Sequence, residues 1–77
     1  MVRAYVLIEM AAGHSTNLVN LLRGRSDVVD ADRVTGPYDV IALLEAADLV
    51  QINDIVTSQI HYLEGVVRTI TCVSLEQ

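Results

Sequence analysis

A turn between two strands is encoded near the middle of the chain by the stretch Val34-Thr35-Gly36-Pro37-Tyr38-Asp39-Val40-Ile41-Ala42. Gly36 accepts backbone angles that a side chain forbids, and Pro37 fixes φ and donates no hydrogen bond. Alternating apolar residues resume directly afterwards, which is typical of a hairpin. Tyr38 and Asp39 are therefore expected at the edge of the turn, where their polar groups can either contact a small partner or satisfy N–H groups of the loop itself. The spacing of the residues leaves both alternatives open.

The residues before the turn predict a strand followed by a helix. Strand-forming side chains alternate over residues 2–10, which places Ala4 and Tyr5 on opposite faces. The pattern then breaks, and Ser15 is the predicted N-cap of a helix that ends near Gly24. This helix is expected to turn four apolar residues inward: Leu18, Val19, Leu21 and Leu22.

Two more strands and a second helix complete the pattern. Residues 28–35 form a predicted strand whose charged side chains suit the edge of a sheet. Residues 38–46 form an apolar strand that suits the interior of a sheet. Asp48 is the predicted N-cap of a helix that runs to Gly65, where a glycine favours termination. A last strand is expected over residues 66–75.

The element order β-α-β-β-α-β is that of the ferredoxin-like α+β fold. Right-handed crossovers place the third strand between the first two, which gives a four-stranded antiparallel sheet with both helices on one face. Apolar side chains nevertheless occupy the other face as well: Tyr5, Leu7, Ile41 and Leu43. Because small domains are only marginally stable, we expect a second copy to cover this face. The prediction is a homodimer, a dimeric α/β sandwich, with further assembly through hairpin tips and helix surfaces.

Composition and charge narrow the class of protein. The chain is expected to form one domain over residues 1–77, and its net charge of −5 argues against a surface that binds nucleic acid. No apolar run approaches the ~20 residues of a transmembrane helix, and no signal peptide is evident, so a soluble cytoplasmic protein is expected. The single cysteine, Cys72, excludes an internal disulfide and is predicted to be buried.

Candidate catalytic and metal-binding residues are sparse. His14 and His61 have no third ligand at metal spacing, so no metal site is predicted. Ser15 and Ser58 lack an arrangement with His and Asp, and no Gly-rich phosphate loop occurs. The sequence therefore predicts neither an enzyme nor a cofactor. A small dimeric α+β barrel enzyme is the alternative, because such enzymes share this fold and can be equally short.

Two segments together resemble one protein family. The turn contains the motif Thr-Gly-x-Tyr-Asp, and about a helix later follows Leu63-Glu64-Gly65-Val66-Val67-Arg68-Thr69-Ile70-Thr71, with Gly-Val and Thr-x-Thr. In order and spacing these motifs resemble the ligand-binding and oligomerisation domain of the Lrp/AsnC family, the RAM domain. The resemblance covers essentially the whole chain.

The resemblance implies a dimer that assembles into rings of dimers and binds free amino acids or related effectors between dimers. It implies an effector site lined by the turn and approached by the second helix of a neighbouring subunit: Thr35, Gly36, Tyr38 and Asp39, with Gln59 and His61. Full-length members carry a helix-turn-helix domain for which this chain has no residues, so direct DNA binding is not expected. The implied function is a stand-alone effector-binding module that modulates full-length Lrp/AsnC transcription regulators. An assembly module without a ligand is a further alternative.

Overall fold

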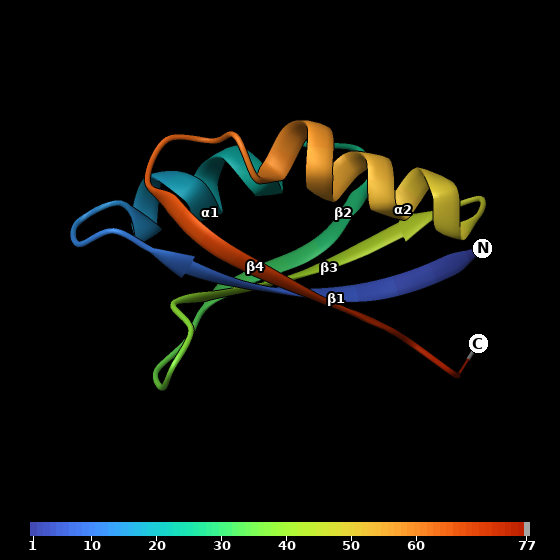
Figure 1. Cartoon of the computed structure of the whole chain (residues 1–77), viewed down its shortest axis with the longest axis horizontal. Coiled ribbons are helices and arrows are strands. Elements are labelled where there is room, and N and C mark those ends of the chain that lie inside the picture. The colour runs from blue at the N-terminus through green and yellow to red at the C-terminus, as the bar shows by residue number, and fades with distance from the viewer. Residues whose placement is uncertain (77) are drawn as a thin grey trace.

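The computed structural model describes residues 1–76, and its elements follow the predicted order (Figure 1). Before the turn come β1 (Val2–Met10), α1 (Ser15–Arg23) and β2 (Val28–Arg33). After the turn come β3 (Val40–Ala46), α2 (Leu49–Ile55), the π-helix η1 (Val56–Ile60) and β4 (Val66–Val73). Both strands that flank the turn are shorter than predicted, because residues 34–39 are held by single hydrogen bonds rather than a ladder.

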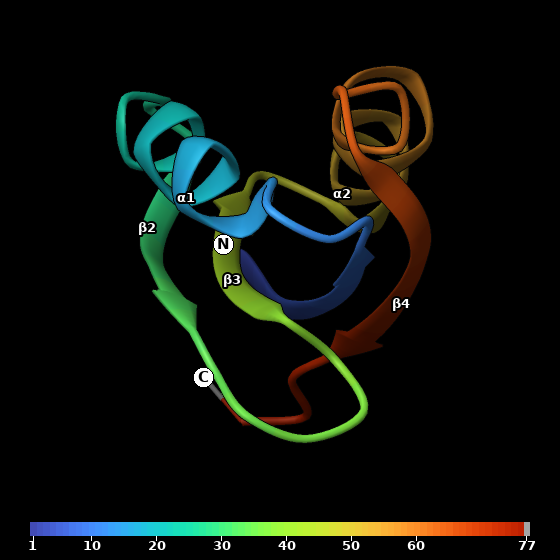
Figure 2. The same cartoon turned by 90° about the vertical axis from the view of Figure 1, so that its left-hand side faces the viewer.

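The four strands form one sheet in the order β2-β3-β1-β4, and every neighbouring pair is antiparallel. The third strand therefore lies between the first and second, as right-handed crossovers require. Both helices cover the same face of the sheet, and the turn between β2 and β3 projects on the other side (Figure 2). The predicted ferredoxin-like α+β fold is confirmed.

The core lies between the helices and the sheet and is entirely aliphatic apart from the thioether of Met10. In β1, Ala4, Val6 and Ile8 are fully buried and alternate with more exposed residues, because successive strand side chains point to opposite faces. β3 repeats this pattern in register with β1. The helices complete the core from above with Leu18, Val19, Leu22, Ile52, Ile55, Val56 and Ile60.

The first helix differs from its prediction at two positions. Its N-cap is His14 rather than Ser15, and the side chain of His14 makes no capping hydrogen bond. Leu21 was expected inside but is 58% exposed. The buried stripe of α1 is centred on Leu18 and Leu22, one helical turn apart, and Leu21 lies to one side of it. The helix ends at Arg23, as predicted.

The second helix begins as predicted and ends earlier. The carboxylate of Asp48 accepts a hydrogen bond of 2.9 Å from the backbone N–H of Gln51, which confirms the N-cap. The helical segment stops at Ile60 instead of continuing to Gly65, which lies in the connection to β4 with a φ of +88°. Within residues 1–76, no helix is long and apolar enough to span a membrane.

The last helical turn is a π-helix, which the periodicity did not predict. The backbone N–H of His61 donates to the carbonyl of Val56 at 2.9 Å, a span of five residues. The hydroxyl of Thr57 donates to the carbonyl of Asn53 at 2.8 Å, where it competes with the regular ladder of the helix. The β-branched residues here also have low helix propensity, so the regular α-helix is easily widened.

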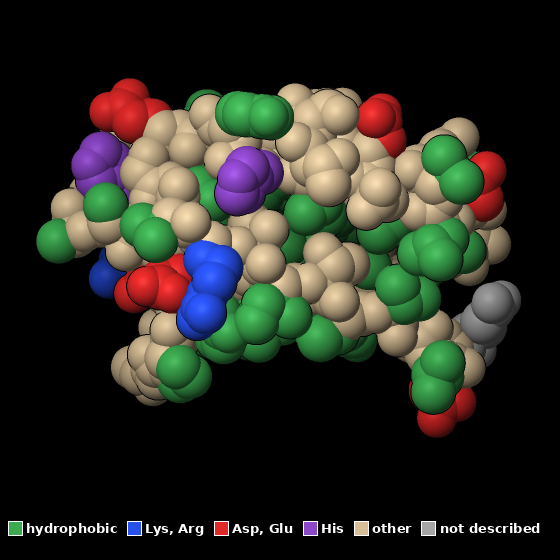
Figure 3. Space-filling model, in the orientation of Figure 1, with side chains coloured by type: hydrophobic (Ala, Val, Ile, Leu, Met, Phe, Trp, Pro, Cys, Tyr) green, Lys and Arg blue, Asp and Glu red, His purple; other side chains and the backbone are tan. Residues whose placement is uncertain are grey.

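The face of the sheet away from the helices is not covered by any described element. We call it the open sheet face and define it by six side chains: Tyr5, Leu7, Ile41, Leu43, Ile70 and Cys72. Tyr5 and Ile70 are 44% and 40% exposed, and hydrophobic side chains line the lower side of the molecule in Figure 3. The prediction that Cys72 is buried is wrong for the single chain, because Cys72 pairs with Tyr5 in register on this face.

Candidate functional site

Backbone hydrogen bonds hold the turn against the end of β1. The N–H of Asp39 donates to the carbonyl of Ile8, and the N–H of Val34 donates to the carbonyl of Asp39, both at 2.9 Å. Between these anchors Gly36 has a φ of +118°, in the region that favours glycine. The tip of the turn is therefore exposed, while its two ends have fixed positions.

The carboxylate of Asp39 also reaches β1. Its Oδ2 accepts a hydrogen bond of 2.8 Å from the backbone N–H of Met10, beside a bulge between Glu9 and Met10. The bulge interrupts the ladder, so this N–H needs another acceptor. The sequence left open contact with a small partner or satisfaction of N–H groups in the loop itself; the backbone N–H that Asp39 satisfies belongs instead to Met10 of β1. No described hydrogen bond within residues 1–76 reaches the other oxygen.

A cavity of about 340 Å³ lies beside the turn, on the side of α1. Its walls combine one cation, one anion, two hydroxyls and one apolar side chain: Arg33, Asp39, Ser15, Thr35 and Val34. The guanidinium of Arg33 is steadied by a hydrogen bond of 3.1 Å from its Nη1 to the hydroxyl of Thr16. The cavity therefore offers groups of both charges at the first turn of α1.

Three residues of this cavity were missed by sequence reasoning: Ser15, Arg33 and Val34. Arg33 was assigned to edge protection and Ser15 to capping, and neither is in the turn motif. Only the packing of the end of β2 beside the start of α1 brings both to Asp39. The position of Arg33, two residues before Thr35, could have suggested that it lies near the turn. The sequence does not show that the start of α1 lies beside it.

Tyr38 lies outside this cavity and contacts β4. Its hydroxyl is 3.5 Å from Nη2 of Arg68, and Cζ of Arg68 is 5.6 Å from the centroid of its ring. The same Nη2 is 3.3 Å from Oε1 of Glu9, the residue opposite Arg68 on β1. The adjacent residues Tyr38 and Asp39 thus make contacts in two different places.

Gln59 lies in η1, and His61 directly follows it. The second helical segment lies on the other side of the sheet from the tip of the turn (Figures 1 and 2). Gln59 accepts a hydrogen bond from Nη2 of Arg25, which also forms a two-point ion pair with Asp27 at 3.0 Å. The ring of His61 stacks edge-on against Tyr62 with 5.6 Å between centroids. One chain does not bring either residue to the turn, and their approach from a neighbouring subunit stays a prediction.

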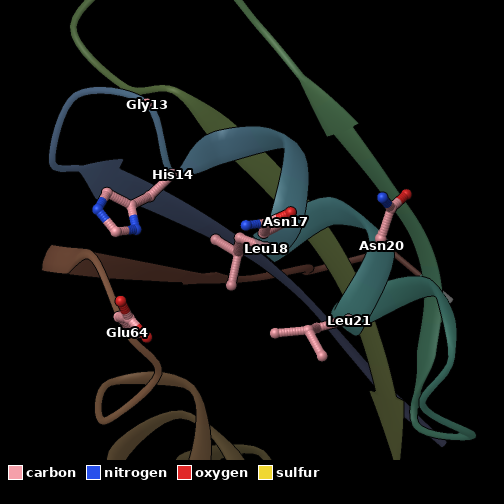
Figure 4. A pocket seen from close by; sticks show the side chains of 7 residues that line it. All are labelled: Gly13, His14, Asn17, Leu18, Asn20, Leu21 and Glu64. Atoms are coloured by element: carbon pink, nitrogen blue, oxygen red, sulfur yellow. The ribbon is translucent and has the colours of Figure 1, made fainter.

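A second cavity, of about 490 Å³, lies between α1 and the connection that precedes β4 (Figure 4). Asn17, Leu18 and Leu21 line it from α1, and Glu64 is the acidic residue of its wall. No arginine lines it among the described residues. An anionic group would therefore find less electrostatic support here than beside Arg33.

Comparison with known proteins gives a consistent family and fold. The family model of the Lrp/AsnC ligand binding domain matches residues 3–77. The crystal structure of TTHA0845 from Thermus thermophilus is similar, with 35% identity and a TM-score of 0.92 over 100% of this chain and 96% of that chain. FFRP-DM1 has 28% identity and a TM-score of 0.93, over 97% of this chain and 100% of that chain.

A more distant similarity extends to a larger protein. The transcriptional regulator NMB0573 from Neisseria meningitidis, solved as a complex with L-Met, has 15% identity and a TM-score of 0.85. The match covers 99% of this chain and 51% of that chain, so this chain spans about half of the regulator. At this identity the similarity concerns the fold alone. Among curated proteins, none matches the chain.

Proposed function

The chain belongs to the Lrp/AsnC ligand-binding domain family, and we propose that it binds a free amino acid in the cavity beside the turn. In this proposal the chain is a cytoplasmic effector-binding and oligomerisation module rather than an enzyme. It acts on full-length Lrp/AsnC transcription regulators through mixed assembly. The observation that carries the proposal is the presence of Arg33 and Asp39 in the wall of one small cavity.

The chemistry of this wall suits a zwitterion. A guanidinium presents paired N–H donors that match a carboxylate, and a carboxylate accepts the N–H groups of an ammonium. The hydroxyls of Ser15 and Thr35 can complete the hydrogen bonds of both groups. The volume of about 340 Å³ is near the lower end of small-molecule pockets, which suits a ligand the size of an amino acid.

A neighbouring subunit is expected to complete the site. The cavity is open on the single chain, and a ligand there would keep part of its surface in water. The proposed dimer covers the open sheet face, and association of dimers would bring Gln59 and His61 of another subunit toward the turn. The Neisseria regulator in complex with L-Met has the same fold, which supports L-methionine as the first compound to test.

The test is calorimetric titration of the full chain with L-methionine and then with each standard amino acid. Two variants each remove one charged group from the cavity. Arg33→Gln removes the cation, and Asp39→Asn removes the anion but keeps an oxygen that can accept from the N–H of Met10. Each variant is expected to weaken binding about tenfold or more, because a charge-assisted hydrogen bond contributes ~1.5–3 kcal/mol.

Arg23→Gln is the matched control. Arg23 lies on α1, pairs with Asp32 at 3.5 Å and does not line this cavity. Its loss is expected to change the affinity less than about twofold, because an exposed ion pair contributes little. Absence of binding by any amino acid at millimolar concentration would overturn the proposal. Equal losses of affinity in Arg23→Gln and Arg33→Gln would overturn the assignment of the binding site to this cavity.

A further inference from the structure

Tyr38 connects the turn to the open sheet face. Its partner, Arg68, lies on β4 directly opposite Glu9 on β1, and the ion pair between them is on the same face as Ile70. The ring of Tyr38 is half-buried against this pair, with the guanidinium carbon 5.6 Å from its centroid. Through Arg68 the ring thus adjoins the open sheet face. The turn that carries Tyr38 projects from one end of the sheet (Figure 1).

Asp39, the residue after Tyr38, belongs to the wall of the cavity. Asp39 lines the proposed amino-acid site and is anchored to β1 by the N–H of Met10. Because Tyr38 and Asp39 are adjacent, a change in the position of one alters the backbone that carries the other. The contacts of Arg68 therefore constrain the turn from the side of the sheet, while Met10 constrains it from the side of the cavity.

We propose that Arg68 is a positioning residue for the amino-acid site. Through Tyr38 it links this site to the subunit that covers the open sheet face. This inference rests on the proposed function. The side chain of Arg68 is 59% exposed, so water screens its contacts in the single chain. A subunit that covers the sheet would remove this water and strengthen the contact between the guanidinium and the ring. Assembly and order in the turn would then favour each other.

Arg3 provides a matched control on the same face. It forms a cross-strand ion pair with Glu45 at 3.2 Å, and its side chain is 42% exposed, but it lies at the other end of β1 from the turn. Arg3→Gln and Arg68→Gln therefore remove similar ion pairs. Only Arg68→Gln also removes the support of Tyr38.

The first measurement needs no ligand: amide hydrogen exchange of residues 34–36, 38 and 39, above and below the protein concentration at which the chain dissociates. The wild-type turn is expected to exchange about fivefold more slowly in the assembled state. Arg68→Gln is expected to lose most of this difference, and Arg3→Gln to keep it. Equal behaviour of the two variants would overturn the link between the turn and assembly.

The second measurement is calorimetric titration of the assembled protein with L-methionine. Arg68→Gln is expected to weaken binding about fivefold, Arg68→Lys to recover part of the loss, and Arg3→Gln to bind as the wild type does. Tyr38→Leu tests the same contact from the turn if Arg68→Gln does not fold. Unchanged affinity in both Arg68→Gln and Tyr38→Leu would overturn the positioning role. If wild type fails to bind L-methionine or any amino acid, the proposed function and the positioning role both fall, while the exchange experiment still decides the link to assembly.

Discussion

Gly65 is the residue at which two loops meet. Its carbonyl accepts from the N–H of Ala11 at 2.7 Å, and a Cβ at its position would lie 2.6 Å from Cβ and Cγ of His14. Its φ of +88° adds backbone strain for any other residue. Gly65→Ala is therefore expected to lower the free energy of unfolding by about 2–4 kcal/mol, from strain and overpacking together. Urea unfolding at fixed protein concentration measures the change.

Gly36→Ala separates the two causes. Gly36 also has a positive φ, of +118°, but a Cβ there would meet no atom within 4 Å. This variant is expected to cost only the backbone strain, about 1–2 kcal/mol. A loss in Gly65→Ala no larger than that in Gly36→Ala would show that the close packing with His14 has no energetic role.

At the scale of the element, the N-cap of α2 makes a measurable contribution. Asp48→Ala removes the acceptor of the N–H of Gln51 and is expected to destabilise the protein by about 1 kcal/mol. Asp54→Ala is the control, because within residues 1–76 its carboxylate accepts only an exposed side-chain hydrogen bond from Ser58, at 3.1 Å. Its effect is expected within about 0.5 kcal/mol. Thermal unfolding followed by circular dichroism compares the two variants.

The elements also show which local features a sequence can predict. β1 follows from a run of strand-forming residues that is apolar on both faces over residues 5–8 and that breaks after Met10. The early end of the second helix does not follow from periodicity, because the apolar spacing continues to Leu63 while the hydrogen bonds widen at Val56. That change depends on competition for backbone carbonyls, which the apolar pattern does not encode.

At the scale of the whole molecule, the open sheet face predicts self-association. Leu43→Glu places a charge at the centre of this face and is expected to weaken the dimer about tenfold or more, because the charge would be buried without a partner. Val50→Glu is the control, since Val50 is 78% exposed on α2 and lies in the helix layer. Sedimentation velocity over a concentration series measures both dissociation constants.

Two outcomes of that experiment contradict the face-to-face dimer. The first is a wild-type chain that remains a folded monomer at micromolar concentration. The second is a loss of association in Val50→Glu that equals the loss in Leu43→Glu. The first result would show that the chain forms no such dimer, and the second would assign the association surface to another part of the molecule.

The order of the elements and the topology of the sheet could be predicted from the sequence, but only part of the candidate site could. Element order and crossover handedness determine the sheet, so the sequence predicts β3 between β1 and β2. Thr35 and Asp39 could be predicted as site residues because they lie close together in the turn motif. Arg33 joins them through the packing of a strand end beside a helix start, and Arg68 meets Tyr38 through the register of β4. Such contacts depend on the distances between elements, which cannot be predicted from the sequence alone.

The anchoring of Asp39 by Met10 limits how the protein can acquire new selectivity. The Asp39 side chain lines the cavity and also accepts the N–H of Met10, so a substitution that removes both carboxylate oxygens is expected to weaken the proposed binding and to destabilise the turn together, whereas Asp39→Asn keeps an acceptor for Met10. Variation in preference among relatives is therefore expected first at Ser15 and Thr35, whose side chains border the same cavity without this second duty. A protein engineer who wishes to retarget the module would begin with those two positions.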